Sequence, residues 1–142
     1  MLVPKKVKHR KWQVGRQSEA KRARPETRGI SLSFGSFGLK SESQDRITSR
    51  QIEAARKAMS RHAGKMAKIW IRIFPDMPVT VKAAQVPMGK GKGDLDHYAT
   101  EVRAGRIIFE VDGVSEEIAR EALRKAGTKL PVKTKVISRE IV

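Results

Sequence analysis

The chain has 142 residues, which suits a single domain with a hydrophobic core. Its 31 Lys+Arg against 15 Asp+Glu give a formal net charge of +16, and such an excess favours a polyanionic partner, most commonly a phosphate backbone. The absence of cysteine excludes disulfides, thiolate catalysis and thiolate metal sites.

An anionic membrane surface is the alternative polyanion. However, no apolar run in the sequence approaches the roughly 20 residues that a spanning helix needs. The first residues, MLVPKKVKHRKW, also lack the apolar stretch of a signal peptide. We therefore expect a cytoplasmic protein with no membrane partner.

Residues 1–28 are strongly basic, and their only acidic residues are Glu19 and Glu26. So few apolar side chains can form no core and cannot offset the entropy of ordering, so we predict a disordered arm that folds only against its partner. Trp12, the one aromatic residue of the arm, is suited to stacking on a base. The alternative is a solvated tail that serves only solubility.

A short strand is predicted next, at residues 30–34. Its apolar residues, Ile30, Leu32 and Phe34, alternate with serines and are expected to share one face. Two glycines shortly afterwards interrupt the strand pattern.

The clearest helix signal lies between Thr48 and Gly64. Thr48 and Gln51 have the spacing of a capping box, while Ile47 and Ile52 have that of a hydrophobic staple. Gly64 is a suitable C-terminal stop.

This predicted helix has an apolar face and a basic face. The apolar stripe consists of Ile52, Ala55, Met59 and Ala63, and the basic residues are Arg50, Lys57, Arg61 and Lys65. We expect the first face to pack on the core and the second to contact phosphates. For any one of these cations, the alternative is a solvated side chain.

The sequence KIWIRIF, at residues 68–74, alternates strictly and predicts a central strand that ends at Pro75. A weaker strand is predicted at residues 79–83. Residues 97–103 and 106–112 are predicted to form a hairpin, with Gly105 supplying the positive φ that a type II turn needs.

Ser115 is placed to cap a second helix, which ends near Gly127 and is followed by a last strand at residues 132–138. The residues of this helix expected to face the core are Ile118, Ala122, Leu123 and Ala126. Strands outnumber helices, so the sequence predicts an α+β fold with two helices packed on a mainly antiparallel sheet. We divide it into the arm, 1–28, and a globular domain, 29–142.

The loop 86–97, VPMGKGKGDLDH, alternates glycine with lysine and is predicted to be mobile. Glycines at 89, 91 and 93 let the backbone approach a phosphate closely, and Lys90 and Lys92 add point charges that read no base sequence. It lacks the spacing of a phosphate-binding P-loop. The alternative is an ordinary hairpin tip.

No catalytic constellation is evident, and we predict no enzyme activity and no cofactor. Asp94, Asp96 and His97 match no metal-ligand spacing, so we predict no metal site. The three histidines fall in three different predicted elements, and no local spacing pairs a nucleophile with a base.

Five segments resemble one known family in order and spacing. They are FGSFGLK at 34–40, RITSRQIEAARKAM at 46–59, KIWIRIFPD at 68–76, MGKGKG at 88–93 and KLPVKTKVISR at 129–139. On these motifs the chain resembles the family of bacterial large ribosomal subunit protein sixteen, whose archaeal and eukaryotic members are called protein ten-e.

The resemblance implies a ribosome-bound structural protein near the base of the central protuberance, beside the A-site tRNA and close to the peptidyl transferase centre. The P-site tRNA is a second candidate contact. Implied partners are large-subunit rRNA, aminoacyl-tRNA and neighbouring large-subunit proteins, without homo-oligomers. The residues expected to bind rRNA are Lys5, Lys6, Lys8, Arg10, Lys11, Trp12, Arg16, Arg28, Arg50, Lys57, Arg61 and Lys65. The residues expected near tRNA are Met88, Gly89, Lys90, Gly91, Lys92 and Gly93.

The chain departs from the family at Pro87, where bacterial members usually carry an arginine that is sometimes hydroxylated. That modification is therefore not expected here, and Pro87 fixes φ and removes an N–H beside the loop. From another functional class, the alternative is a free architectural protein that binds DNA.

Overall fold

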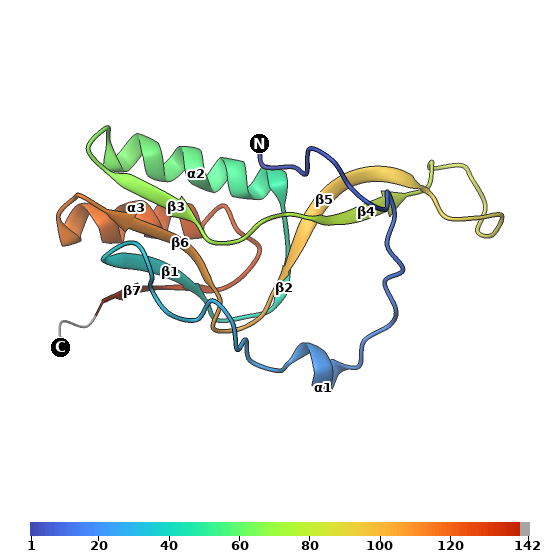
Figure 1. Ribbon diagram of the computed structural model, residues 1–142, viewed down its shortest axis with the longest axis horizontal. Helices are drawn as coiled ribbons and strands as arrows, with labels where there is room; N and C mark the ends of the chain where they lie inside the picture. Colours follow the sequence, from blue (N-terminus) through green and yellow to red (C-terminus); the bar gives the residue numbers. More distant parts are fainter. Residues whose placement is uncertain (140–142) are drawn as a thin grey trace.

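The protein is represented by a computed structural model (Figure 1). The structure describes residues 1–139, so the last three residues of the expected domain lie outside the described range. Ten elements occur within that range. They are α1 (Glu19–Arg22), β1 (Phe37–Ser41), β2 (Asp45–Thr48), α2 (Ser49–Ala63), β3 (Lys68–Ile71), β4 (Met77–Val81), β5 (Asp94–Val102), β6 (Ile107–Asp112), α3 (Glu116–Gly127) and β7 (Thr134–Ser138).

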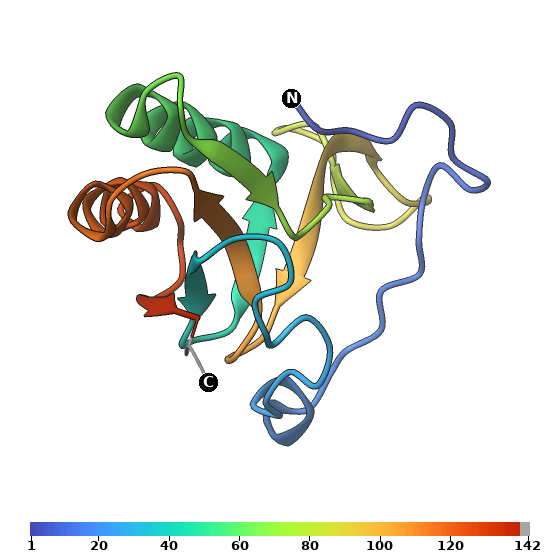
Figure 2. The ribbon, with the colours of Figure 1, turned by 60° about the vertical axis from the view of Figure 1, so that its left-hand side comes forward.

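The strands form two antiparallel sheets, which confirms the α+β class. A four-stranded sheet has the order β3-β6-β1-β7, and a three-stranded sheet has the order β2-β5-β4. Helices α2 and α3 lie side by side on one face of the larger sheet (Figure 2). The β4–β5 ribbon extends away from this body to the far end of the molecule (Figure 1).

Helix α2 begins as the sequence predicts. The backbone N–H of Gln51 donates to Thr48 Oγ1 at 3.2 Å, and the N–H of Thr48 donates to Gln51 Oε1 at 2.9 Å, which completes the capping box. The C-cap is Gly64, with φ +80°. The predicted apolar stripe is buried, as are both residues of the staple, Ile47 and Ile52.

Helix α3 lies where it was expected, but its buried face differs at one position. Ala119, Ala122, Leu123 and Ala126 are buried, whereas Ile118 is 41% exposed, so its placement in the core was wrong. At about 100° per residue, Ile118 is turned away from the stripe that begins at Ala119. Ser115 occupies the N-cap position without a side-chain hydrogen bond.

The strand predicted at residues 30–34 was also wrong, because the first strand is β1, Phe37–Ser41. Residues 30–36 instead cross the face of the larger sheet opposite the helices (Figure 2). Gly35 permits this close approach, since a Cβ there would lie 2.8 Å from the carbonyl oxygen of Val111. Phe34, one of the three apolar residues of the expected strand, is 56% exposed.

A buried carboxylate holds this crossing segment. Glu110 is fully buried, and its oxygens accept the backbone N–H groups of Ser33 at 2.7 Å and Phe34 at 3.1 Å. Arg72 pairs with the same carboxylate at 3.3 Å, and its guanidinium lies 5.3 Å from the centre of the Phe34 ring. That ring stacks on Trp70 with centroids 5.9 Å apart.

Two predictions of strand pairing were wrong. Among the strands of residues 1–139, β3 lies at the edge of its sheet beside β6, although Ile69 and Ile71 pack against the core as the alternation predicted. Strands β5 and β6 do not form a hairpin, because they belong to different sheets. The turn itself is present, with Gly105 at φ +102° and the Arg106 N–H bonded to Arg103 O, and it passes the chain from one sheet to the other.

We expect Glu110→Gln to destabilise the fold by about 3 kcal/mol, because it leaves Arg72 without its partner and turns an amide group toward backbone N–H donors. The measurement is the free energy of unfolding from urea titration. The control is Glu42→Gln, which changes an exposed carboxylate and is expected to stay within about 0.5 kcal/mol of the wild type. A Glu110→Gln protein as stable as the control would contradict this role.

Candidate nucleic-acid interface

Helix α2 presents an exposed basic face. Arg50, Lys57 and Arg61 fall within about 40° of one another around the helix and lie opposite the buried stripe. Lys65 is exposed just beyond the C-cap. Within residues 1–139 none of these four cations forms an ion pair, so their charges are available to a partner.

The acidic residue beside this face is already neutralised. Arg56 donates from Nε to Glu53 Oε2 at 3.1 Å and from Nη2 to Glu53 Oε1 at 2.5 Å. These bonds hold the pKa of Glu53 below its ordinary value. Glu53 therefore stays ionised at neutral pH, and Arg56 rather than Lys57 is its direct partner.

The arm, residues 1–28, runs as an extended chain whose only regular element is the single turn α1. All the cations that we assigned to rRNA binding in this arm are exposed, and Trp12 is 41% exposed. Leu2 packs against the hydrophobic core, a contact that the sequence did not indicate. The guanidinium of Arg106 bonds to the carbonyl of Arg28 at 3.1 Å, where the arm joins the domain.

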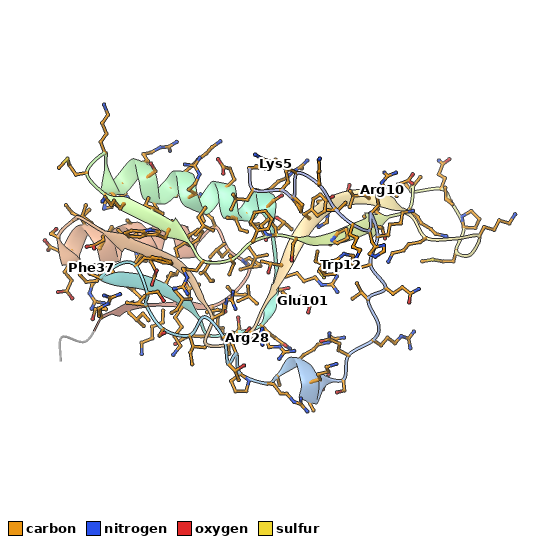
Figure 3. All side chains as sticks on the ribbon, viewed as in Figure 1. Lys5, Arg10, Trp12, Arg28, Phe37 and Glu101 are labelled. Atoms are coloured by element: carbon orange, nitrogen blue, oxygen red, sulfur yellow. The ribbon has the colours of Figure 1, made fainter. Side chains whose placement is uncertain are left out.

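The structure brings the arm and the glycine–lysine loop together. Lys11 Nζ donates to the carbonyl of Lys92 at 3.4 Å, and Lys92 Nζ donates to the carbonyl of Trp12. In Figure 3, Trp12 lies where the arm meets the β4–β5 ribbon, and Arg28 lies at the other end of the arm. No sequence signal indicated this contact, because it joins residues about 80 positions apart through backbone carbonyls that every residue has.

The loop is the tip of the β4–β5 hairpin and lies earlier in the chain than expected, because β4 ends at Val81 and residues 94–97 already belong to β5. Gly89, Lys90 and Gly91 all have positive φ, and Lys90 is the one non-glycine residue among 1–139 that does. Met88 is 94% exposed. Lys90 is exposed, and the loop that carries it lies at the far end of the β4–β5 ribbon (Figure 1).

The three glycines of the loop have different structural roles. Gly89 and Gly91 supply positive φ in open space, whereas a Cβ on Gly93 would lie 2.8 Å from the carbonyl of Val81. Gly93 is therefore needed for packing within the hairpin. Lys82, which the sequence did not single out, also supports the loop, since its Nζ donates to Gly89 O at 2.5 Å.

The acidic edge of the loop forms a pair and no larger cluster. Asp96 Oδ2 lies 2.7 Å from His97 Nδ1, and Asp94 takes no part in that contact. Across the part of the chain that is described, no three His, Asp or Glu side chains are grouped as metal ligands. In the same range, no helix is long and apolar enough to cross a membrane.

The chain is similar to known proteins over almost its whole length. Residues 4–137 match the family described as ribosomal protein L16p/L10e. A protein named large ribosomal subunit protein uL16 from Cereibacter sphaeroides is 54% identical over 141 residues, which cover 99% of this chain and 98% of that protein. A protein of the same name from Halorhodospira halophila is 53% identical over 142 residues, which cover 100% of both chains. The similarity therefore spans the arm, the helices and the loop.

Proposed function

The chain belongs to the ribosomal protein L16p/L10e family, and on that basis we propose that it binds large-subunit rRNA near the base of the central protuberance and contacts A-site tRNA close to the peptidyl transferase centre. A protein of this family is a structural component of the large ribosomal subunit and not an enzyme. Its other partners are neighbouring large-subunit proteins.

One observation carries the proposal. Exposed cations without carboxylate partners line the arm and one face of α2, while the loop at the far end of the projecting ribbon exposes Lys90. Cations of this kind displace the counterions condensed on a phosphate backbone, and they require no particular base sequence. The rRNA contacts are thus assigned to the arm and α2, and the tRNA contact is assigned to residues 88–93.

The cations assigned to rRNA and the lysines assigned to tRNA lie on different kinds of structural element. Those of α2 stand on a rigid, capped helix, and the arm is long enough to follow grooves between rRNA helices. The loop is joined to the body by two strands only, and a Gly–Lys backbone offers N–H groups as well as ammonium groups to a phosphate. A free architectural protein is the weaker alternative, because relatives matched over their whole length carry large-subunit names.

The arm assignment predicts a loss of incorporation when its charge is removed. Replacing Lys5, Lys6 and Lys8 together by Gln keeps Leu2 in the core but removes three phosphate contacts, so incorporation into large subunits is expected to fall severalfold. The measurement is the fraction of tagged protein that sediments with large subunits after a salt wash. The matched control replaces three exposed lysines outside the assigned set, Lys68, Lys133 and Lys135. Equal sedimentation of the two variants would refute the assignment of the arm.

The loop assignment predicts the opposite pattern. Lys90→Ala removes a charge that makes no hydrogen bond or ion pair within residues 1–139, so incorporation should be unchanged. Binding of aminoacyl-tRNA to the A site of the assembled ribosome should weaken about threefold to tenfold, roughly the effect of one phosphate contact. Adding Lys92→Ala should weaken it further and also release the arm contact at Trp12. If Lys90→Ala lowered incorporation into large subunits instead, the loop would be an rRNA anchor.

A further inference from the structure

A second group of cations surrounds a hollow between α2 and α3. The hollow has a volume of about 330 Å³. Its lining residues are Ala58, Arg61 and His62 from α2, and Lys125, Thr128 and Lys129 from the end of α3 and the residues after it. Apart from Arg61, none of these belongs to the set that the sequence assigned to RNA.

The polar groups of the hollow are arranged as donors. Lys125 Nζ lies 3.2 Å from His62 Nδ1, and since an ammonium group can only donate, this nitrogen accepts. The neutral imidazole then carries its hydrogen on Nε2, which leaves a further donor. In the described part of the chain, Arg61, Lys125 and Lys129 form no ion pair.

The negative groups nearby are already engaged. Glu121 accepts from Arg124 Nη2 at 2.6 Å and Nε at 3.0 Å, and these bonds lower the pKa of its carboxyl group. The end of α3 carries partial negative charge, but Thr128 Oγ1 donates to the carbonyl of Lys125 at 2.6 Å and satisfies one of its last acceptors. The excess charge around the hollow is therefore positive.

We propose that this hollow binds phosphate groups of the rRNA backbone, as an extension of the basic face of α2 across the helix pair. The inference rests on the proposed function, since it assumes that rRNA is the partner. Arg61 belongs to both surfaces, and Lys57 lies one turn earlier on the same face, so one strand of phosphates can follow α2 into the hollow. The lining contains no Phe, Tyr or Trp on which a base could stack, so the contact recognises the backbone rather than the sequence.

The first test is the salt dependence of binding to a large-subunit rRNA transcript. In the double variant Lys125→Gln/Lys129→Gln, the slope of log affinity against log salt should become shallower by about 1.5, as expected for the loss of two phosphate contacts. The matched control is Lys133→Gln/Lys135→Gln, which removes the same charge from exposed positions on and beside β7 and should keep the wild-type slope.

The second test uses the absence of cysteine in the chain. Lys129→Cys, labelled with an iron chelate and assembled into large subunits, should direct hydroxyl-radical cleavage of rRNA near the hollow. A shallower slope together with cleavage supports the inference. If the double variant matches its control, or if position 129 lies against a protein and cleaves no rRNA, the inference is overturned although steep binding by the wild type still supports the proposed function. If the wild type shows no salt-dependent binding, the proposed function fails as well.

Discussion

The buried carboxylate of Glu110 is the interaction on which the arrangement of the domain depends. The larger sheet has one face covered by α2 and α3, and its other face is crossed by the irregular segment 30–36, which forms no strand. The carboxylate of Glu110 holds the segment on the sheet, because it accepts hydrogen bonds from two backbone N–H groups of the segment. It also pairs with Arg72. A buried charge is tolerated only when its hydrogen bonds are satisfied. The carboxylate of Glu110 therefore requires both the backbone N–H groups of the segment and the guanidinium of Arg72. The arm joins the domain directly before this segment, so the same interaction fixes where the arm ends.

On the surface, three carboxylates of the two long helices are paired locally. Glu53, Glu116 and Glu121 each bind an arginine three or four residues away on their own helix. Such pairs lie within one helix and leave the cations of the arm and of the α2 face unmatched. The fold is stabilised by a hydrophobic core and one buried ion pair, so its stability does not depend on surface ion pairs. Surface ion pairs contribute little to stability, and the surface can therefore carry a large excess of positive charge.

The sequence was most informative where structure is determined locally. The capping box of Thr48 and Gln51, the stripe of α2 and the positive φ of Gly105 each depend on a few neighbouring residues, and all three were predicted correctly. Partnerships between distant segments were not predictable. Alternation around Gly105 indicated two strands and a turn, but it carries no information on whether they pair with each other or with separate sheets.

Residues 30–34 were misassigned for a related reason. Their alternation is typical of a strand, but the carboxylate that binds their backbone lies more than 75 residues away in sequence. In the candidate interface, composition and the family resemblance identified the basic residues of the arm, of α2 and of the loop. They could not reveal that Lys92 contacts the arm, or that Lys125 and Lys129 join Arg61 around one hollow, because both arise from packing.

The central claim is that unmatched cations on this fold cancel the charge of a folded ribosomal RNA. The most direct test measures the affinity of the isolated wild-type protein for a large-subunit rRNA transcript between 50 and 200 mM salt, in competition with duplex DNA. For about six to ten phosphate contacts the affinity should fall by about 10³ to 10⁵ over that range, and the rRNA should be preferred. An affinity that does not change with salt, or a preference for duplex DNA, would contradict the account.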